Sequence, residues 1–296
     1  MLLVCKKIMI IVKLQGGLGN QMFQYAMGRS VSLKKDTELS LDISSFEKDI
    51  LRKYALSPFQ IKARFARPEE IKKFIKYKRL HGPLRHLWNI FVASQRKYFE
   101  EKQFHFDYEV FNINKDAYID GYWNTEKYFL DIRDILLNDF KTSNSSSKKN
   151  EEISKQISTS NSVSIHIRRG DYANDLKTNS IWGTLEQEYY EKAMKIITEK
   201  ISNPKFFVFS DDMVWVKQNM NFPSDTIFIN GNNPVEDMRL MSLCKHNVIA
   251  NSTFSWWGAW LNENKEKIVI GPKNWFKTKK QSTDTKDVLP LSWIKI

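Results

Sequence analysis

Two adjacent arginines follow an apolar, β-branched run in the stretch Ser164-Ile165-His166-Ile167-Arg168-Arg169-Gly170-Asp171-Tyr172. Guanidinium groups bind phosphate oxygens through paired hydrogen bonds, so Arg168 and Arg169 together predict a site for a group with two or three negative charges, such as a pyrophosphate. The alternative is a surface strand end whose arginines form salt bridges. The position favours a site, because ligands of open α/β sheets bind at the carboxyl ends of the strands.

Two further polar clusters end apolar runs in the second half of the chain, Ser210-Asp211-Asp212 and Asn251-Ser252-Thr253-Phe254-Ser255. The second cluster puts three hydroxyls around a predicted helix start, where backbone N–H groups favour phosphate oxygens, although helix capping explains one hydroxyl. Acidic pairs at strand ends sometimes hold a divalent metal. Because two arginines could neutralise a diphosphate without one, we expect no metal at Asp211 and Asp212.

A glycine turn, residues 15–21, follows the first predicted strand, residues 8–14. Its glycines permit positive φ and let a ligand approach the backbone, which predicts an anion or sugar site. The turn lacks the lysine of a P-loop and the spacing of the dinucleotide fingerprint, which argues against ATPases and nicotinamide enzymes. Later, the stretch 117–123 reads as a strand that runs into the turn Gly121-Tyr122-Trp123. Exposed rings there would stack on a sugar face, and the alternative is a packed aromatic corner.

The elements that position these groups alternate between strand and helix, which predicts an α/β chain with parallel sheets and right-handed crossovers. In the second half we expect strands over 163–167, 205–210, 226–229, 246–250 and 268–270, and helices over 184–200, 235–244 and 254–261. Thr184 and Gln187 have the spacing of a capping box for the first of these helices. In the first half we expect a strand over 38–42 and helices over 22–33, 68–80 and 128–140.

Composition narrows the class of protein. The chain has 296 residues, 42% of them hydrophobic, which is enough for one large or two ordinary domains. Its two cysteines cannot form a disulfide framework. Lysines interrupt the apolar amino-terminal stretch well short of the roughly 20 residues of a membrane span. We therefore expect a cytoplasmic protein without a signal peptide.

The net charge of +12 is concentrated between Lys62 and Arg85, where nine basic residues accompany two acidic ones. Such a field attracts nucleic acid, anionic lipid or a phosphate-bearing substrate, and it also occurs on a merely solvated helix face. A nucleic-acid-binding protein is thus the alternative from another class. Because the lysines follow helical spacing without interleaved aromatic residues on a sheet, we expect no nucleic acid partner.

Four motifs, in this order over nearly the whole chain, together resemble the bacterial α-1,2-fucosyltransferases of glycosyltransferase family 11: GGLGNQMFQYAMGRS, HIRRGDY, FSDD and NSTFSWWGAW. HxRRxD is shared with α-1,6- and protein O-fucosyltransferases, so a fucosyltransferase of another linkage is an alternative. The resemblance implies inverting transfer of L-fucose from GDP-β-L-fucose to the 2-hydroxyl of a galactose-terminated glycan. It implies no metal or other cofactor, and a role in O-antigen or similar glycan synthesis.

The resemblance also implies a GT-B architecture, in which two Rossmann-like domains face across a cleft. We expect an acceptor-side domain over 1–140, a linker region over 141–160 and a GDP-fucose-binding domain over 161–275. The segment 276–296 could pack back on the N-terminal domain. The basic stretch lies on the acceptor side, so we expect peripheral contact with the inner membrane face or with a lipid-linked glycan.

Individual roles carry over through the motifs. Arg168 should contact the β-phosphate and the glycosidic oxygen, Arg169 and Asp171 should support the donor and the catalytic loop, and Asn20 should lie near the reacting centre. The resemblance thus implies Arg168, Asn20 and Asp171 as the catalytic residues. The expected donor-binding residues are Arg168, Arg169, Gly17, Gly19, Asp211, Asp212, Ser252, Thr253, Phe254 and Ser255, and the expected acceptor-binding residues are Tyr122 and Trp123.

The general base is the one role that the resemblance leaves open. The α-1,6 enzymes have a glutamate a few residues beyond HxRRxD, and Leu176 stands at that place. Asp175, His166 and Asp171 are the candidates. His166 points away from its apolar neighbours if the strand alternates, and a structurally hydrogen-bonded histidine is the alternative there.

Overall fold

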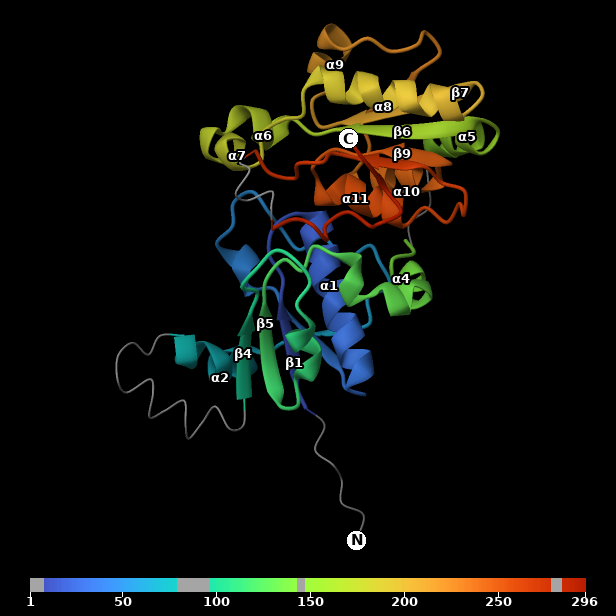
Figure 1. The fold of residues 1–296 in the computed structure, drawn as a ribbon. Coiled ribbons are helices and arrows are strands. Elements are labelled where there is room, and N and C mark those ends of the chain that lie inside the picture. The colour runs from blue at the N-terminus through green and yellow to red at the C-terminus, as the bar shows by residue number, and fades with distance from the viewer. Residues whose placement is uncertain (1–7, 79–95, 143–146, 278–283) are drawn as a thin grey trace. The chain divides into compact units, whose positions relative to one another are not determined.

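The computed structural model describes residues 8–78, 96–142, 147–277 and 284–296 (Figure 1). Two compact units make up the chain, residues 1–143 and 144–296. Each is built on a parallel sheet, because buried β-branched runs alternate with helices along the sequence. Among the described residues, no helix is long and apolar enough to cross a lipid bilayer.

The described part of the first unit forms a five-stranded parallel sheet in the order β3-β2-β1-β5-β4. Its strands are β1 (Ile10–Lys13), β2 (Leu39–Asp42), β3 (Arg64–Phe65), β4 (Arg96–Glu100) and β5 (Asp116–Asp120). Its helices are α1 (Leu18–Lys34), α2 (Pro68–Lys78) and α4 (Arg133–Asp139), with short 3-10 helices η1 (Ser44–Glu47), η2 (Tyr108–Asn112), η3 (Glu126–Tyr128) and η4 (Leu130–Ile132).

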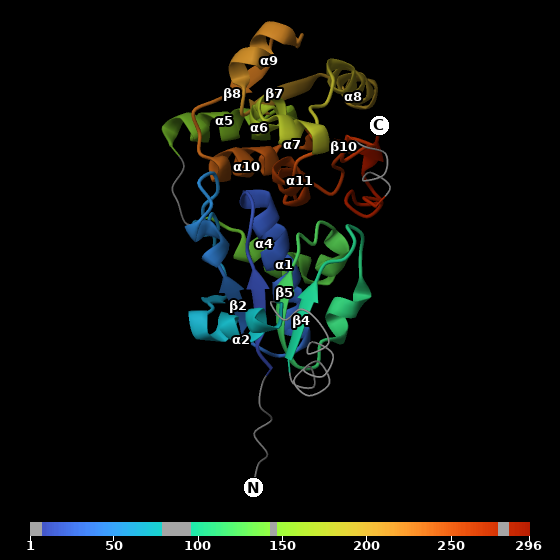
Figure 2. The ribbon, with the colours of Figure 1, turned by 90° about the vertical axis from the view of Figure 1, so that its left-hand side faces the viewer.

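Helices α1 and α2 cover opposite faces of this sheet. Successive side chains of a strand point to opposite faces. Ile11 of β1 packs with Ile71 and Phe74 of α2. Its neighbour Val12 lies against Gly28 of α1. Figures 1 and 2 show the two helices on either side of the strands, so the central strand is buried on both faces.

The second unit, within the described residues, has a six-stranded parallel sheet in the order β11-β10-β9-β6-β7-β8. Its strands are β6 (Asn161–Ile167), β7 (Pro204–Ser210), β8 (Ile227–Ile229), β9 (His246–Val248), β10 (Val269–Gly271) and β11 (Ile294–Lys295). Its helices are α5 (Lys148–Ser158), α6 (Gly170–Asn174), α7 (Leu176–Ile181), α8 (Gln187–Lys200), α9 (Met213–Asn219), α10 (Pro234–Leu243) and α11 (Thr253–Trp260).

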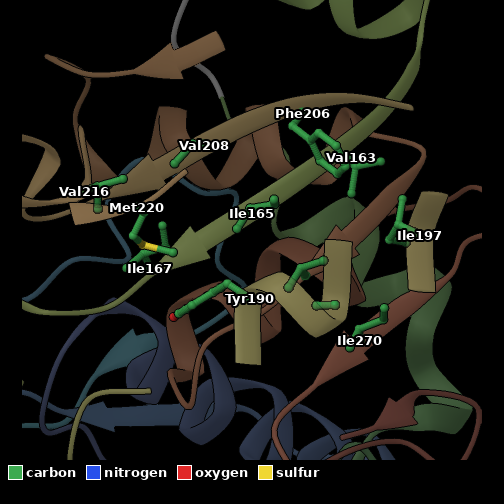
Figure 3. Close-up of a cluster of buried hydrophobic side chains, with 12 residues drawn as sticks. Val163, Ile165, Ile167, Tyr190, Ile197, Phe206, Val208, Val216, Met220 and Ile270 are labelled. Atoms are coloured by element: carbon green, nitrogen blue, oxygen red, sulfur yellow. The ribbon is translucent and has the colours of Figure 1, made fainter. Parts of the chain in front are cut away.

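The central strand β6 divides the side chains of this unit between two faces. Val163, Ile165 and Ile167 pack with Tyr190 and Ile197 of α8, as Figure 3 shows. Each aliphatic side chain that is fully buried in this way contributes about 1.5–3 kcal/mol to stability. The alternate residues of β6 face α10 and α11, where the Ser164 hydroxyl accepts a hydrogen bond from Asn247. Packing of the β6 side chains on both faces therefore fixes the position of the residues that follow Ile167.

The predicted strands and helices of the second half are present, with ends shifted by a few residues. The capping box is wrong: α8 begins at Gln187, its N-cap is Glu186, and no side-chain hydrogen bond caps it in the described structure. In the first half, α1 begins at Leu18, so the second part of the glycine turn is helical. The predicted helix over 128–140 is mostly 3-10 turns, and only Arg133–Asp139 is α-helical.

Helix α5 and strand β11 bear on two domain-level expectations. The region 141–160 was expected to be a linker, but α5 occupies most of it and buries Ile153 and Ile157. The segment 276–296 was expected to pack on the N-terminal domain. Its described end joins the second unit, because β11 pairs with β10 and Trp293 packs against Trp256, and packing on the N-terminal domain stays a prediction.

Candidate active site

Arg168 directly follows β6 and is held between two carboxylates. Its Nη2 lies 2.5 Å from Asp171 Oδ1, and its Nη1 lies 2.6 Å from Asp211 Oδ2. The guanidinium carbon is 5.2 Å from the centre of the Tyr172 ring. The parallel register explains the second pair, because Ile167 is opposite Ser210 and the next residues of both strands meet at the same edge. The guanidinium is therefore fixed in position by two carboxylates and a ring.

Gly170 is required by the position of Asp211. A Cβ atom added at residue 170 would clash with Asp211 Oδ2, which also bonds Arg168. The other oxygen of Asp211 accepts the backbone N–H of Arg169 at 2.8 Å. The carboxylate of Asp211 thus makes two bonds to the turn and lies close to Gly170, which gives a physical reason for the glycine in the Arg-Arg-Gly-Asp sequence.

Arg169 lies over the ring of a tryptophan that sequence reasoning missed. Its guanidinium carbon is 3.4 Å from the centre of the Trp215 ring, within the range of a cation–π interaction. Its Nε is 3.5 Å from Asp212 Oδ2, and Asp212 Oδ1 accepts the N–H of Trp215. The available signal was an aromatic residue in the first turn of the helix after Ser-Asp-Asp. Both aspartates thus contact the arginine pair, and their contact with guanosine stays a prediction.

The hydroxyl cluster begins α11, as expected from its sequence. Capping explains none of the three hydroxyls, because the described structure has no side-chain cap at Ser252. Ser255 is fully buried and its hydroxyl bonds the carbonyl of Ser252. Thr253 and Phe254 are half-buried at the first turn. The backbone N–H groups of this turn are therefore the groups best placed to meet phosphate oxygens.

His166 is buried beneath this edge of the sheet, 4% exposed. Its ring contacts Phe254, and its Nδ1 has no hydrogen-bond partner among the described residues. Burial, and secondarily the charge of Arg168, lower the pKa of His166 to about 3. The imidazole is therefore neutral and a weak proton acceptor at neutral pH.

A second polar cluster, also missed from the sequence, lies at the start of α10. Asp237 accepts a hydrogen bond from Asn232, whose own side-chain oxygen accepts one from Asn150. Burial raises the pKa of Asp237 to about 6. In the described part of the chain, Asn150 Oδ1 is buried without a partner. Asp237 is half-buried and is linked to Asn150 through Asn232, and the sequence signal for this cluster was only an acid in the first helical turn.

The glycine turn of the first unit is organised by side-chain amides. Gly16 has φ +78°, and a Cβ there would lie 2.7 Å from the Nδ2 atom of Asn20, so the asparagine packs closely over the turn. Gly17 is the N-cap of α1, and Gly19 is buried in its first turn. Gln21 donates to the carbonyls of Gly16 and Lys53 and accepts from the N–H of Ala55.

Trp123 is not an exposed sugar-stacking residue, which corrects the expectation for it. It has no exposed surface, it packs on Phe99 and Tyr128, and its φ is +60°. Glu101 enforces this corner by accepting the N–H groups of both Tyr122 and Trp123. Tyr122 is 39% exposed and is the ring of the pair that a ligand can reach.

The expected catalytic residues fall in both units. Arg168 and Asp171 are in contact in the second unit, together with the donor-binding candidates Arg169, Asp211 and Asp212. Asn20 belongs to the first unit. No cluster of three or more histidine, cysteine or acidic side chains able to hold a metal occurs in the ranges that the structure describes.

The model of glycosyl transferase family 11 matches residues 2–296. The chain belongs to this family. It is 34% identical over 295 residues to an alpha-1,2-colitosyltransferase of Escherichia coli, covering 97% of this chain and 98% of that one. It is 36% identical over 308 residues to the O-antigen biosynthesis glycosyltransferase WbnK of Escherichia coli, covering 96% and 99%.

Among solved structures, the NodZ alpha-1,6-fucosyltransferase co-crystallized with GDP has a TM-score of 0.51 at 12% sequence identity, covering 86% of this chain and 92% of that chain. At this identity the likeness concerns the fold alone. Together with the two parallel-sheet units, it confirms the predicted α/β fold of GT-B type with Rossmann-like units.

The buried imidazole makes a testable contribution to stability. The folded pKa of His166 is about 3, below the ordinary 6.5, so the unfolded chain binds this proton first as the pH falls. Its stabilising contribution is full above pH 6.5 and is lost between pH 6.5 and pH 3. Between pH 7 and pH 5 the loss should be about 2 kcal/mol.

Replacement His166→Gln should remove that part of the pH dependence, measured by chemical unfolding of the second unit at both pH values. Curves for wild type and variant that stay parallel from pH 7 to pH 5 would contradict the assignment.

Proposed function

We propose that this family member is an inverting transferase that moves L-fucose from GDP-β-L-fucose to the 2-hydroxyl of a galactose-terminated glycan, forming an α-1,2 linkage. The observation that carries the proposal is Arg168, a guanidinium fixed at the carboxyl end of a parallel strand. The names of two relatives that match almost the whole chain support an α-1,2 linkage and a role in glycan synthesis. One is an alpha-1,2-colitosyltransferase, and the other is an O-antigen biosynthesis glycosyltransferase.

The chemistry follows from the charge that develops during transfer. As the bond between the sugar and GDP breaks, negative charge builds on a β-phosphate oxygen. A fixed guanidinium aimed at that oxygen stabilises the transition state more than the ground state. Arg169, supported by Trp215, supplies a second positive charge. The first turn of α11, with Ser252, Thr253, Phe254 and Ser255, offers backbone N–H groups to the phosphates.

GDP-colitose is the competing donor, because a relative covering almost the whole chain is named a colitosyltransferase. Fucose carries a 3-hydroxyl that colitose lacks. A site built to bond that hydroxyl would discriminate strongly against the deoxy sugar. The alternative to an α-1,2 linkage is transfer of the sugar to another hydroxyl of the acceptor.

The acceptor side is assigned to the first unit. Asn20 over the glycine turn and the reachable ring of Tyr122 are the groups we expect to contact the acceptor or the reacting centre. Both belong to a unit separate from the one with the arginine pair.

Incubation with labelled GDP-fucose and GDP-colitose, a panel of galactosides and linkage analysis of the products tests the assignment. We expect α-1,2-fucosylated product from the wild type. Arg168→Ala should keep the circular dichroism spectrum but lose at least about a hundredfold in kcat. Arg168→Lys should recover only part, because a lysine cannot bond two oxygens in a plane. Near-normal turnover by the alanine variant would refute the role of Arg168.

We also propose that transfer needs no metal, because Arg168 and Arg169 supply two positive charges for the diphosphate. Activity measured after exhaustive chelation with EDTA should equal that of the untreated enzyme, and added Mg²⁺ or Mn²⁺ should not raise kcat. A loss of activity that a divalent cation restores would overturn this part of the proposal.

The basic helix α2 is proposed as a contact for an anionic membrane face or a lipid-linked glycan, and no nucleic acid is assigned to it. Lys72 and Lys73 are exposed on the side opposite the buried Ile71 and Phe74. Arg64 is already bonded to the buried carboxylate of Glu70, so the two lysines are the better ligands. Residues 79–85 of the basic stretch lie outside the described residues.

Cosedimentation with phosphatidylglycerol-containing vesicles should fall several-fold for Lys72→Glu/Lys73→Glu at low salt, because each lysine near such a surface contributes about 1 kcal/mol. A matched double change of Lys195 and Lys200, on α8 of the second unit, controls for net charge. Equal loss in both variants would remove the assignment to α2.

A further inference from the structure

More carboxylates than guanidiniums surround the arginine pair. Two guanidiniums, Arg168 and Arg169, contact three carboxylates, those of Asp171, Asp211 and Asp212. Both terminal nitrogens of Arg168 are engaged, one by each of two aspartates. Each terminal nitrogen keeps one further N–H, but a diphosphate that approaches Arg168 meets the negative charge of both carboxylates while these contacts persist. Repulsion between the diphosphate and the carboxylates therefore favours release of the guanidinium by one of them when the donor binds.

Asp211 is the carboxylate that stays. Its Oδ1 accepts the backbone N–H of Arg169, and its Oδ2 occupies the space beside Gly170, so it is anchored by the main chain of the turn. Asp171 stands in the first turn of the five-residue helix α6. Its side chain is 29% exposed and that of Asp211 is 27% exposed, so the main-chain anchor of Asp211, and not exposure, distinguishes the two. A short helix and a local pair three residues apart are easily rearranged. Asp171 is thus the group that the diphosphate displaces.

We propose that Asp171 is the proton acceptor of the transfer, and that the donor's diphosphate makes it available by replacing it on Arg168. The inference rests on the proposed function. In the step itself, Asp171 takes the proton of the acceptor hydroxyl. That hydroxyl oxygen forms its bond to the anomeric carbon, and the electron pair of the breaking carbon–oxygen bond goes to the β-phosphate of GDP, beside Arg168.

The other two candidates are poorer bases. His166 is buried with a pKa of about 3. Asp175 caps α7 by accepting the N–H of Thr178 at 2.6 Å, and bonds to Thr178 hold the pKa of Asp175 below its ordinary value. A carboxylate that loses its guanidinium partner, in contrast, becomes a better proton acceptor. Displacement by the diphosphate would thus activate the base only when a donor is bound.

The exchange predicts opposite effects for the two carboxylates on Arg168. Asp171→Asn removes the competitor of the diphosphate, so GDP should bind several-fold more tightly by calorimetry. The same change should lower kcat by about 10²–10⁴, the usual contribution of a general base, and abolish the acidic limb of the kcat–pH profile. Asp211→Asn removes the anchor, so GDP should bind more weakly.

Weaker GDP binding by Asp171→Asn, an unchanged kcat or a retained acidic limb would each overturn the proposal. Tight GDP binding also reports that the variant is folded. The outcome is separable from the proposed function: wild-type protein that binds GDP but transfers neither fucose nor colitose would refute that function, whereas the two GDP affinities would still test the exchange at Arg168.

Discussion

A guanidinium at the end of a buried strand needs carboxylates to hold it, and the rest of this site depends on how that need is met. The parallel register of β6 and β7 brings Asp211 beside Arg168, although 43 residues separate them in the sequence. The same carboxylate fixes the backbone after Arg169 and demands a glycine at residue 170. Asp211 thus links the pairing of β6 with β7, the conformation of the turn after Arg169 and the position of the Arg168 guanidinium.

The strands of the second unit, the edge at which the arginines lie and helix α2 could all be predicted from residue types and spacing. The β-branched residues at 163, 165 and 167 predict a short strand, and such strands are typical of a parallel sheet covered on both faces. Because the carboxyl ends of parallel strands lie at the same edge of a sheet, the sequence alone predicts that Arg168 and the Ser-Asp-Asp cluster lie at one edge. Helix α2 was equally readable, since Pro68, two glutamates and an apolar stripe mark its start and its buried side.

What could not be read depends on contacts between residues far apart in the chain. Trp123 is buried because Glu101 captures its N–H and positive φ turns its ring inward. Trp215 supports Arg169 only because β7 pairs with β6. The end of the chain joins the second sheet through pairing of Ile294 with Ile270, and a two-residue strand has no periodicity to reveal it.

The amide of Gln21 has a consequence for exchanging substrate loops between relatives. Its three hydrogen bonds connect the glycine turn to the backbone at residues 53 and 55. The conformation of the turn therefore depends on that of the segment around residues 53–55. A chimera that imports residues 43–55 from another member would keep the turn in place only if the imported backbone meets this side chain in the same way. Transplanting the loop together with the first turn of α1 is therefore the sounder unit for engineering.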